Sequence, residues 1–308
     1  MDIEVRPLVE TDLGGADQIF RDAFGTFLGA DMFGDTDLLR SRFRAPHTAA
    51  LAAFVDGELV GSNLVTRWGS VAYFGPLSVV PKLWDAGIGT RLVAATTEVL
   101  AGWGVTHQGL FTFAQSAKHH RLYQKFGFWP RFLTAIMSRP VSGAEPPLGW
   151  RLSAAGPADR ELLVDGCAVV TDAILPDLEV RGEIAAVLDQ GLGDVVLTGE
   201  PDMPRAFAVC HTGGGSEAGS GIAYLKFAAV RPGPGAAEAF AVLLDACQGY
   251  AAEVGAERLA LGVNTARHDA YRHLLGAGFR TDTPGVTMHR PNAPGYDRED
   301  VYLLDDWR

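Results

Sequence analysis

The order of predicted strands and helices in the first half of this 308-residue chain is repeated loosely in the second half. Between the halves, the segment "PVSGAEPPLG" (140–149) has three prolines, two glycines and no periodicity, which is typical of a linker. A repeated order of elements predicts two similar domains, at residues 1–140 and 151–308, joined by residues 141–150. Each domain is expected to be of the α/β (α+β) class, with helices flanking a mixed sheet.

Apolar periodicity and turn residues define the expected elements of the first half. We expect strands at 3–8, 49–55, 58–69, 71–80, 107–114 and 132–139, and helices at 9–24, 89–100 and 116–126. Gly102 is expected to end the second helix and Ser116 to cap the third. Gly75-Pro76 interrupts one strand, and because proline cannot donate to a ladder, neighbouring strands are expected to part there.

The second half is predicted from the same signals. We expect helices at 157–174, 236–255 and 266–279, and strands at 194–199, 205–211, 221–230, 258–264 and 285–290. The Gly- and Ser-rich stretch "HTGGGSEAGSG" (211–221) is expected to be a flexible loop.

Composition excludes several classes of protein. The net charge is −1 over residues 1–150 and −10 over residues 151–308, which argues against nucleic acid as a partner. The three cysteines Cys167, Cys210 and Cys247 lack metal-ligand spacing, so we expect buried thiols and no metal. No apolar run approaches about 18 residues and no leader is recognisable, so we expect a cytoplasmic protein with no membrane partner.

The segment "SVVPKLWDAGIGTRL" (78–92) has the form of a phosphate cradle. A strand, Val-Pro and a short excursion lead to Gly87-Ile-Gly at the start of a helix, where backbone N–H groups attract anions. A Rossmann fingerprint fails because Leu92 occupies the third glycine position, and the Walker Gly-Lys-Ser/Thr is missing. Neither nucleotide loop fits.

The same segment resembles the acetyl-CoA loop of the GNAT superfamily of N-acetyltransferases, which runs Val-x-Pro, short loop, Gln/Arg-x-x-Gly-x-Gly/Ala. The resemblance implies that N–H groups near the helix start bind the pyrophosphate of CoA and that the main chain of the splayed strand pairs with the pantetheine arm. The cofactor-binding residues expected from it are Leu77, Ser78, Val79, Val80, Asp85, Ala86, Gly87, Ile88, Gly89, Thr90 and Ser116. Trp84 departs from the pattern, so the site is expected to depend on the helix dipole and backbone donors, with Arg91 and Lys82 as possible added charge.

A second motif, "SAKHHRLYQKFGF" (116–128), resembles the GNAT pattern Asn-x-x-Ala-x-x-Leu-Tyr-Glu-Lys-Leu-Gly-Phe. The resemblance implies that Tyr123 lies near the CoA sulfur and protonates the leaving thiolate, as general acid. The strand at 71–80 lacks the carboxylate that many GNAT enzymes use as a base. His119 and His120, four and three residues before Tyr123, are the remaining base candidates.

The acceptor region is expected from the same resemblance in residues 24–39 and 131–137. Asp31, Asp35 and Asp37 offer negative charge for a cationic group, or cap a helix without any ligand.

The second half lacks both functional motifs. Gly235 follows Pro232 by only three positions, whereas Gly89 follows Pro81 by eight, and Leu274 takes the place of Tyr123 when the Gly-Phe pairs are aligned. We therefore expect a degenerate GNAT-like domain at 151–308. The whole resembles two-domain GNAT proteins of the YitH acetyltransferase type.

These features predict an N-acetyltransferase that moves acetyl, or another short acyl group, from acetyl-CoA to a small-molecule or peptide amine in a ternary complex. No nucleophile constellation points to a covalent intermediate. The alternative is a non-catalytic acyl-CoA-binding sensor or partner-binding module, which the missing carboxylate and Trp84 favour. The oligomeric state is expected to be a monomer or a homodimer.

Overall fold

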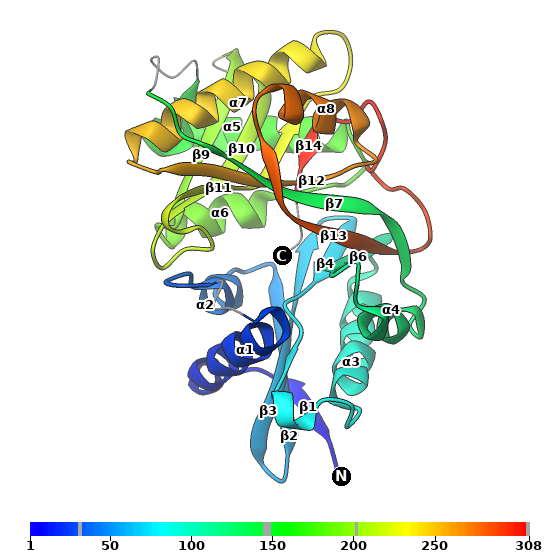
Figure 1. The fold of residues 1–308 in the computed structure, drawn as a ribbon. Coiled ribbons are helices and arrows are strands. Elements are labelled where there is room, and N and C mark those ends of the chain that lie inside the picture. Colours follow the sequence, from blue (N-terminus) through cyan, green and yellow to red (C-terminus); the bar gives the residue numbers. More distant parts are fainter. Residues whose placement is uncertain (30–32, 144–148, 201–202, 306–308) are drawn as a thin grey trace.

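A computed structural model of the protein describes residues 1–29, 33–143, 149–200 and 203–305. Strands in this part form one mostly antiparallel sheet that runs through both halves (Figure 1). In the first half the strands are β1 (Glu4–Pro7), β2 (Thr48–Val55), β3 (Glu58–Trp68), β4 (Val71–Phe74), β5 (Ser78–Val79), β6 (His107–Thr112) and β7 (Trp129–Pro140). In the second half they are β8 (Trp150–Arg151), β9 (Gly193–Glu200), β10 (Met203–Gly213), β11 (Gly219–Val230), β12 (Arg258–Asn264), β13 (Arg280–Arg290) and β14 (Leu303–Leu304).

Helices cover both faces of the sheet in each half (Figure 1). They are α1 (Leu13–Leu28), α2 (Leu38–Phe43), α3 (Ile88–Trp103), α4 (Ala117–Gln124), α5 (Pro157–Asp172), α6 (Arg181–Asp189), α7 (Ala236–Glu253) and α8 (His268–Gly276). Separate apolar clusters lie under α1 with α2, and under α3 with α4. In the second half, α7 and α8 cover one cluster and α5 and α6 the other.

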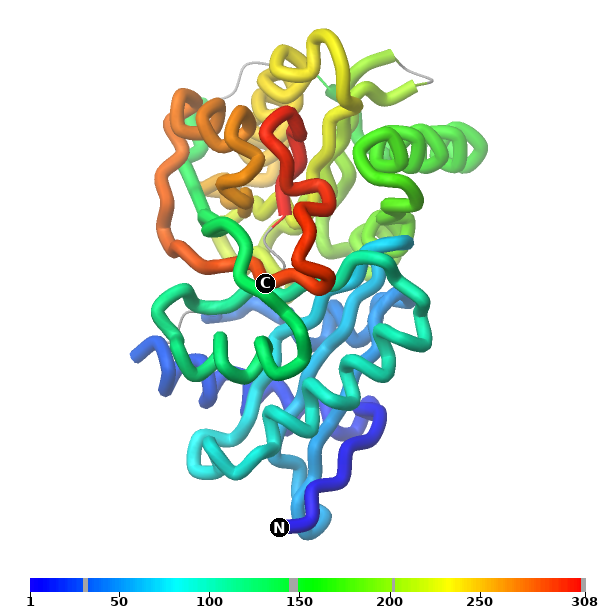
Figure 2. The backbone as a smooth tube through the Cα atoms, turned by 90° about the vertical axis from the view of Figure 1, so that its right-hand side faces the viewer, coloured from blue at the N-terminus to red at the C-terminus, as the bar shows by residue number. Residues whose placement is uncertain are grey.

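The two halves exchange a strand. The order of neighbours along the sheet is β6-β13-β7-β12, so β7 of the first half and β13 of the second each lie between strands of the other half. β7 pairs with β12 from Thr134↔Asn264 to Pro140↔Arg258, and β13 pairs with β6 from Val286↔Thr112 to Arg290↔Gln108. The tube trace shows both strands crossing the junction of the halves (Figure 2). Residues 129–140 and 280–290 therefore each complete the other half's sheet, and the limits 1–140, 141–150 and 151–308 stay a prediction.

Most expected elements of the first half are present, with small shifts at their ends. The hairpin turn at Asp56-Gly57 has positive φ at both residues (51° and 83°), as a tight turn between twisted strands requires. Ser116 caps α4 by accepting from His119 N at 3.5 Å, as predicted. The prediction that Gly102 ends its helix was wrong, because α3 continues to Trp103 and Gly104 takes the left-handed conformation.

The stretch 211–221 is not the flexible loop that its glycines predicted. Residues 211–213 belong to β10 and residues 219–221 to β11, and Glu217 between them is buried. Ser220 donates to Asp35 from its N at 2.9 Å and also from its hydroxyl, which ties this hairpin to the first half. α2, α6, β8 and β14 are additional elements that apolar periodicity did not predict.

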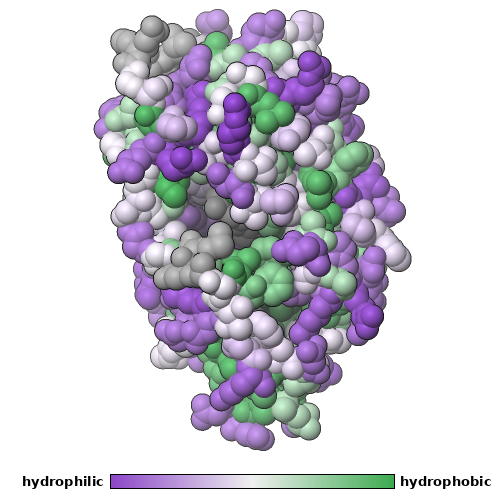
Figure 3. All heavy atoms as spheres, in the orientation of Figure 1, coloured by the Kyte–Doolittle hydropathy of each residue, from purple (hydrophilic) through white to green (hydrophobic). Residues whose placement is uncertain are grey.

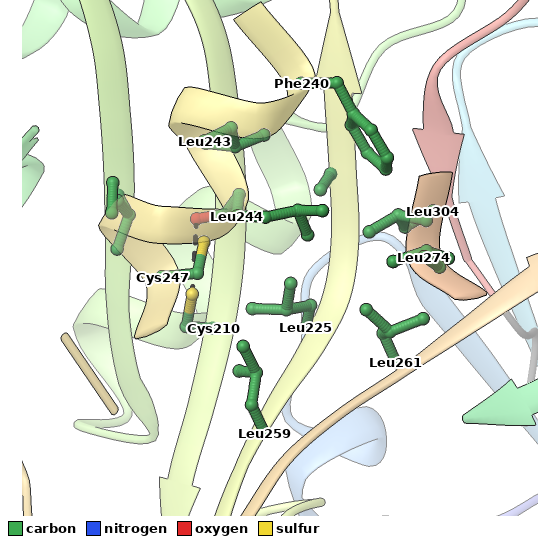
Figure 4. Close-up of a cluster of buried hydrophobic side chains, with 14 of the residues drawn as sticks. Cys210, Leu225, Phe240, Leu243, Leu244, Cys247, Leu259, Leu261, Leu274 and Leu304 are labelled. Atoms are coloured by element: carbon green, nitrogen blue, oxygen red, sulfur yellow. Dashed lines mark hydrogen bonds between the residues drawn. The ribbon is translucent and has the colours of Figure 1, made fainter. Parts of the chain in front are cut away.

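The core of the second half includes the cysteines at β10 and α7. Cys167, Cys210 and Cys247 are buried free thiols, as expected. Figure 4 shows Cys247 and three apolar side chains of α7 over Cys210, Leu225, Leu259 and Leu261 on the strands. In the described part of the chain, no helix is long and apolar enough to cross a membrane, and no three His, Cys, Asp or Glu side chains are grouped to hold a metal ion.

Candidate functional site

The sheet opens between β5 and β6. β4 pairs in parallel with β6 only as far as Tyr73↔Gly109, and after the Gly75-Pro76 break β5 pairs with β3 alone. Val80 N donates to Val60 O at 2.9 Å. Because main-chain groups alternate along a strand, Ser78 and Val80 direct theirs toward β3, and Leu77 and Val79 direct theirs into the opening.

The loop after β5 prepares the start of α3. Pro81–Leu83 form a short 3-10 turn, Gly87 adopts a left-handed φ of 87° as N-cap, and the helix begins at Ile88. The first intrahelical hydrogen bond in this region runs from Arg91 N to Gly87 O at 3.1 Å. In the turn before the helix, Ala86 N already donates to Leu83 O at 3.3 Å. The N–H groups of Gly87 to Thr90 precede the intrahelical ladder, which leaves them available to an anion.

Trp84 makes its own contacts within this loop. Its indole N–H donates to Val79 O at 2.8 Å, and the Lys118 ammonium lies 5.4 Å from its ring centroid. Lys118 also pairs with Asp85 at 2.8 Å. Lys118 of α4 therefore brings a positive charge beside this loop.

A cavity of about 790 Å³ lies where β5, the loop, α3, α4 and α1 meet. Its lining includes nine of the residues predicted for the site: Leu77, Val79, Asp85, Gly87, Ile88, Gly89, Thr90, Ser116 and His119. Five other predicted residues, Ser78, Val80, Ala86, His120 and Tyr123, are not among the described lining residues. A Cβ added to Gly89 would lie 3.5 Å from the Leu122 side chain, so the glycine leaves open the space between α3 and α4.

Tyr123 lies behind the cavity wall. Its side chain is 7% exposed in the apolar cluster under α3 and α4, and its ring packs edge-on against Phe74 with centroids 5.8 Å apart. Burial raises the pKa of the Tyr123 phenol, so the group stays protonated at neutral pH. Its protonation state suits a proton donor. Because Tyr123 does not line the cavity, contact with a ligand requires either a local movement of the protein or a ligand that reaches past the lining residues.

Of the two candidate bases, His119 is among the described residues that line the cavity and His120 is not. His119 lines the cavity, with its ring centroid 5.2 Å from that of Phe27 and 6.4 Å from that of Tyr123. Burial lowers the pKa of His119, assisted by the charges of Lys118 and His120, so the imidazole is neutral near pH 7. In the described structure its Nδ1 is buried without a hydrogen-bond partner.

Several lining residues escaped the sequence reasoning. Lys118 and Arg121 of α4 and Lys125 at its C-cap bring positive charge to the cavity, in place of the expected Lys82 and Arg91. Their i, i+3 and i+7 spacing, shared with Leu122, is the signal that would have found them. The lining also includes Phe113, which carries no such motif, and Phe24 and Phe27, which lie in the expected acceptor region 24–39.

The acidic residues expected at the acceptor site are engaged elsewhere. Asp35 accepts from Ser220, and Asp37 caps α2 by accepting from Arg40 N. Neither lines the cavity, and Asp31 lies outside the described residues.

A buried charge network joins the second half to this opening. Arg42 of α2 donates to both carboxylate oxygens of Glu217, at 3.1 and 2.7 Å, and also to Gly75 O at 3.0 Å. Lys226 contacts the same carboxylate and lies 3.3 Å from Glu183. Burial alone would raise the pKa of the Glu217 carboxyl. The positive charges of Arg42 and Lys226 outweigh this effect and lower the pKa, so the carboxylate is ionised.

Comparisons with solved structures show which known proteins share this fold. A structure described as a putative acetyltransferase from Pyrococcus horikoshii is 19% identical, with a TM-score of 0.66 over 99% of this chain and 95% of that one. A GNAT-family N-acetyltransferase structure from Sphaerobacter thermophilus is 16% identical, with a TM-score of 0.64 over 94% and 95%. A tandem GNAT protein from the clavulanic acid biosynthesis pathway is 14% identical, with a TM-score of 0.58 over 94% and 98%.

No relative was found among curated proteins. The family model of the acetyltransferase (GNAT) family matches residues 16–128, which include β5, the loop, α3 and α4. The chain therefore holds a domain of the acetyltransferase (GNAT) family in its first half, within a two-part fold that it shares over nearly its whole length with GNAT structures.

Proposed function

We propose that this protein is an acyl-CoA-dependent N-acyltransferase that moves acetyl, or another short acyl group, to an amine by direct attack in a ternary complex. The observation that supports it most is the start of α3, where the N–H groups of Gly87 to Thr90 border the same cavity as the main chain of Leu77 and Val79. Backbone donors at a helix N-terminus suit a pyrophosphate. The main chain of Leu77 and the N–H of Val79 suit the amides of pantetheine, whereas Val79 O already accepts from Trp84.

The residues of α4 fit this role by their charge. Lys118, Arg121 and Lys125 line the cavity beside the loop and would neutralise the phosphates of CoA. Gly87 and Gly89 keep side chains out of the cradle. CoA, when bound, supplies the thioester, and no metal is needed for amine attack on it.

His119 and Tyr123 are proposed as base and acid. His119 would take a proton from the amine, since its lowered pKa keeps it neutral. Tyr123 would give a proton to the departing thiolate, since its raised pKa keeps it protonated. His120 stays a weaker base candidate, because it is not among the lining residues.

A second candidate function is a non-catalytic acyl-CoA sensor or partner-binding module. It is favoured by the burial of Tyr123 and by β4 and β5, whose residues include no carboxylate. In either case the second half is proposed to be a degenerate domain that supports the first. A cytoplasmic location, the YitH-like type and a monomeric or homodimeric state remain predictions.

Binding and turnover separate the two functions. Acetyl-CoA is expected to raise the melting temperature, because a ligand stabilises the state that binds it. A panel of amines is then screened for release of free CoA with a thiol reagent. Tight binding of acetyl-CoA with no amine-dependent release would favour the sensor.

Tyr123→Phe tests the acid. It is expected to lower turnover more than acetyl-CoA affinity, because the hydroxyl acts only when the thiolate leaves. Equal losses in turnover and affinity would rule out the assignment.

A further inference from the structure

One wall of the cavity is aromatic. Phe24 and Phe27 lie three residues apart on α1, and Phe113 follows the end of β6. The Phe113 ring centroid is 4.8 Å from that of Phe27 and 6.2 Å from that of Phe24. Phe27 keeps 37% of its surface exposed, and apolar side chains gather on the molecular face between α1 and α4 (Figure 3).

The rings border the candidate base directly. Phe27 lies 5.2 Å from the ring of His119, and Phe113 lies 6.4 Å from it. An apolar group seated against Phe27 and Phe113 would therefore hold an attached amine beside His119. Aromatic rings favour tilted contact with another ring, because the edge of one meets the face of the next.

The described cavity lining offers no free carboxylate to a polycationic ligand. The charged lining residues in the described part of the chain are Lys118, Arg121, Lys125 and Asp85. Asp85 is already paired with Lys118 at 2.8 Å. No described lining carboxylate is therefore left to recognise a second positive charge on an acceptor.

We propose that the acceptor is a primary amine that carries an aromatic ring and no second positive charge. This deepens the proposed N-acyltransfer and depends on it. Phe24, Phe27 and Phe113 bind the ring, and the amine, once neutral, lies beside His119. The aromatic wall also excludes water, which disfavours hydrolysis of the thioester.

Phenylethylamine and spermidine test this class with acetyl-CoA as donor. Free CoA is measured with a thiol reagent, and kcat/KM is expected to be at least about tenfold higher for phenylethylamine. Phe27→Ala is expected to lower that value by about tenfold while leaving KM for acetyl-CoA unchanged. The matched control is Phe43→Ala, because Phe43 packs under the same helix but does not line the cavity.

Saturation-transfer NMR adds a readout that does not need turnover. Phenylethylamine is expected to bind the acetyl-CoA-loaded protein, and Phe27→Ala to weaken that binding more than Phe43→Ala does. Preferred turnover of spermidine would overturn the aromatic class and leave N-acyltransfer standing. Acetyl-CoA binding without CoA release from any amine of the panel would overturn both.

Discussion

The two halves of the molecule differ most at the point where a sheet can open. In the first half, β4 stops pairing with β6 after Tyr73, and the opening beside β5 leads into the cavity. In the second half, β11 runs unbroken and pairs with β14 through Ala228↔Leu304 and Ala229↔Leu303. Asp305 N also donates to Gly262 O of β12 at 3.0 Å. A strand of the chain itself thus occupies the second opening.

The helix that follows each opening keeps the same start. Gly87 before α3 and Gly235 before α7 are both left-handed N-caps, with φ of 87° and 76°. At the site aligned with the proposed acid, Tyr123 is replaced by Leu274, which lies in the core that Figure 4 shows. We therefore propose that a glycine at a helix start is not enough for a cofactor site, and that the sheet beside it must also be open.

The largest expected effect concerns the ion pair that joins the halves. Glu217→Gln removes one charge and leaves Arg42 and Lys226 buried with less compensation, which should cost about 3–5 kcal/mol of unfolding free energy. Acetyl-CoA affinity should also fall, because Arg42 holds Gly75 O beside the opening. Urea unfolding and calorimetric titration measure the two effects.

Glu10→Gln is the matched control for this pair. Glu10 pairs with Arg44 at 3.0 Å on the surface, so its loss should cost less than about 1 kcal/mol. Equal costs for the two variants would mean that the halves do not depend on the buried network.

The next effect tests the strand that fills the second opening. Leu304 is fully buried, so Leu304→Ala should cost about 3 kcal/mol, against less than about 0.5 kcal/mol for exposed Leu162→Ala. Acetyl-CoA should still bind once per chain, because the second half lacks the loop. A titration that ends at two per chain would contradict the assignment of one site to the first half.

The sequence predicted what depends on local chain chemistry. The hairpin at Asp56-Gly57, the Ser116 cap and the Gly87 loop each depend on a few neighbouring residues with special φ or hydrogen bonding. The exchange of β7 and β13 was not predictable, because alternation of apolar residues defines a strand without naming its partner.

Buried charge was the other limit of sequence reasoning. Glu217 lies in a Gly- and Ser-rich stretch that is typical of surface loops, and its partner Arg42 is 175 positions away. Only the fold brings the two together. The same holds for Phe27 and Phe113, which come from different elements and form one cavity wall.

A smaller effect is the pH dependence due to His211 in the second half, which we compare with His119 in the first half. Burial, followed by the Lys226 charge, lowers the pKa of His211 to about 4. The unfolded chain therefore binds more protons at this site between about pH 6.5 and 4, and stability falls as the pH falls through that window. From pH 7.5 to 5 this site should remove about 2 kcal/mol, and the loss should be absent in His211→Gln.

His119 should respond differently, because it borders the cavity. Its titration is expected to appear in the pH profile of kcat/KM rather than mainly in stability. An acid limb of that profile that His119→Gln leaves in place would remove His119 as the base.

The smallest expected effect is the most direct comparison of the halves. In both Gly87→Ala and Gly235→Ala the new Cβ has no atom within 4 Å, so each variant bears only the cost of a left-handed φ, about 1–2 kcal/mol. The free energy of unfolding should therefore fall by a similar amount in the two variants. Acetyl-CoA binding should weaken in Gly87→Ala alone, because only that methyl group enters a cradle that an anion must approach. Equal losses of acetyl-CoA binding in the two variants would show that both substitutions act through stability. That result would contradict the proposed acetyl-CoA site at the first opening.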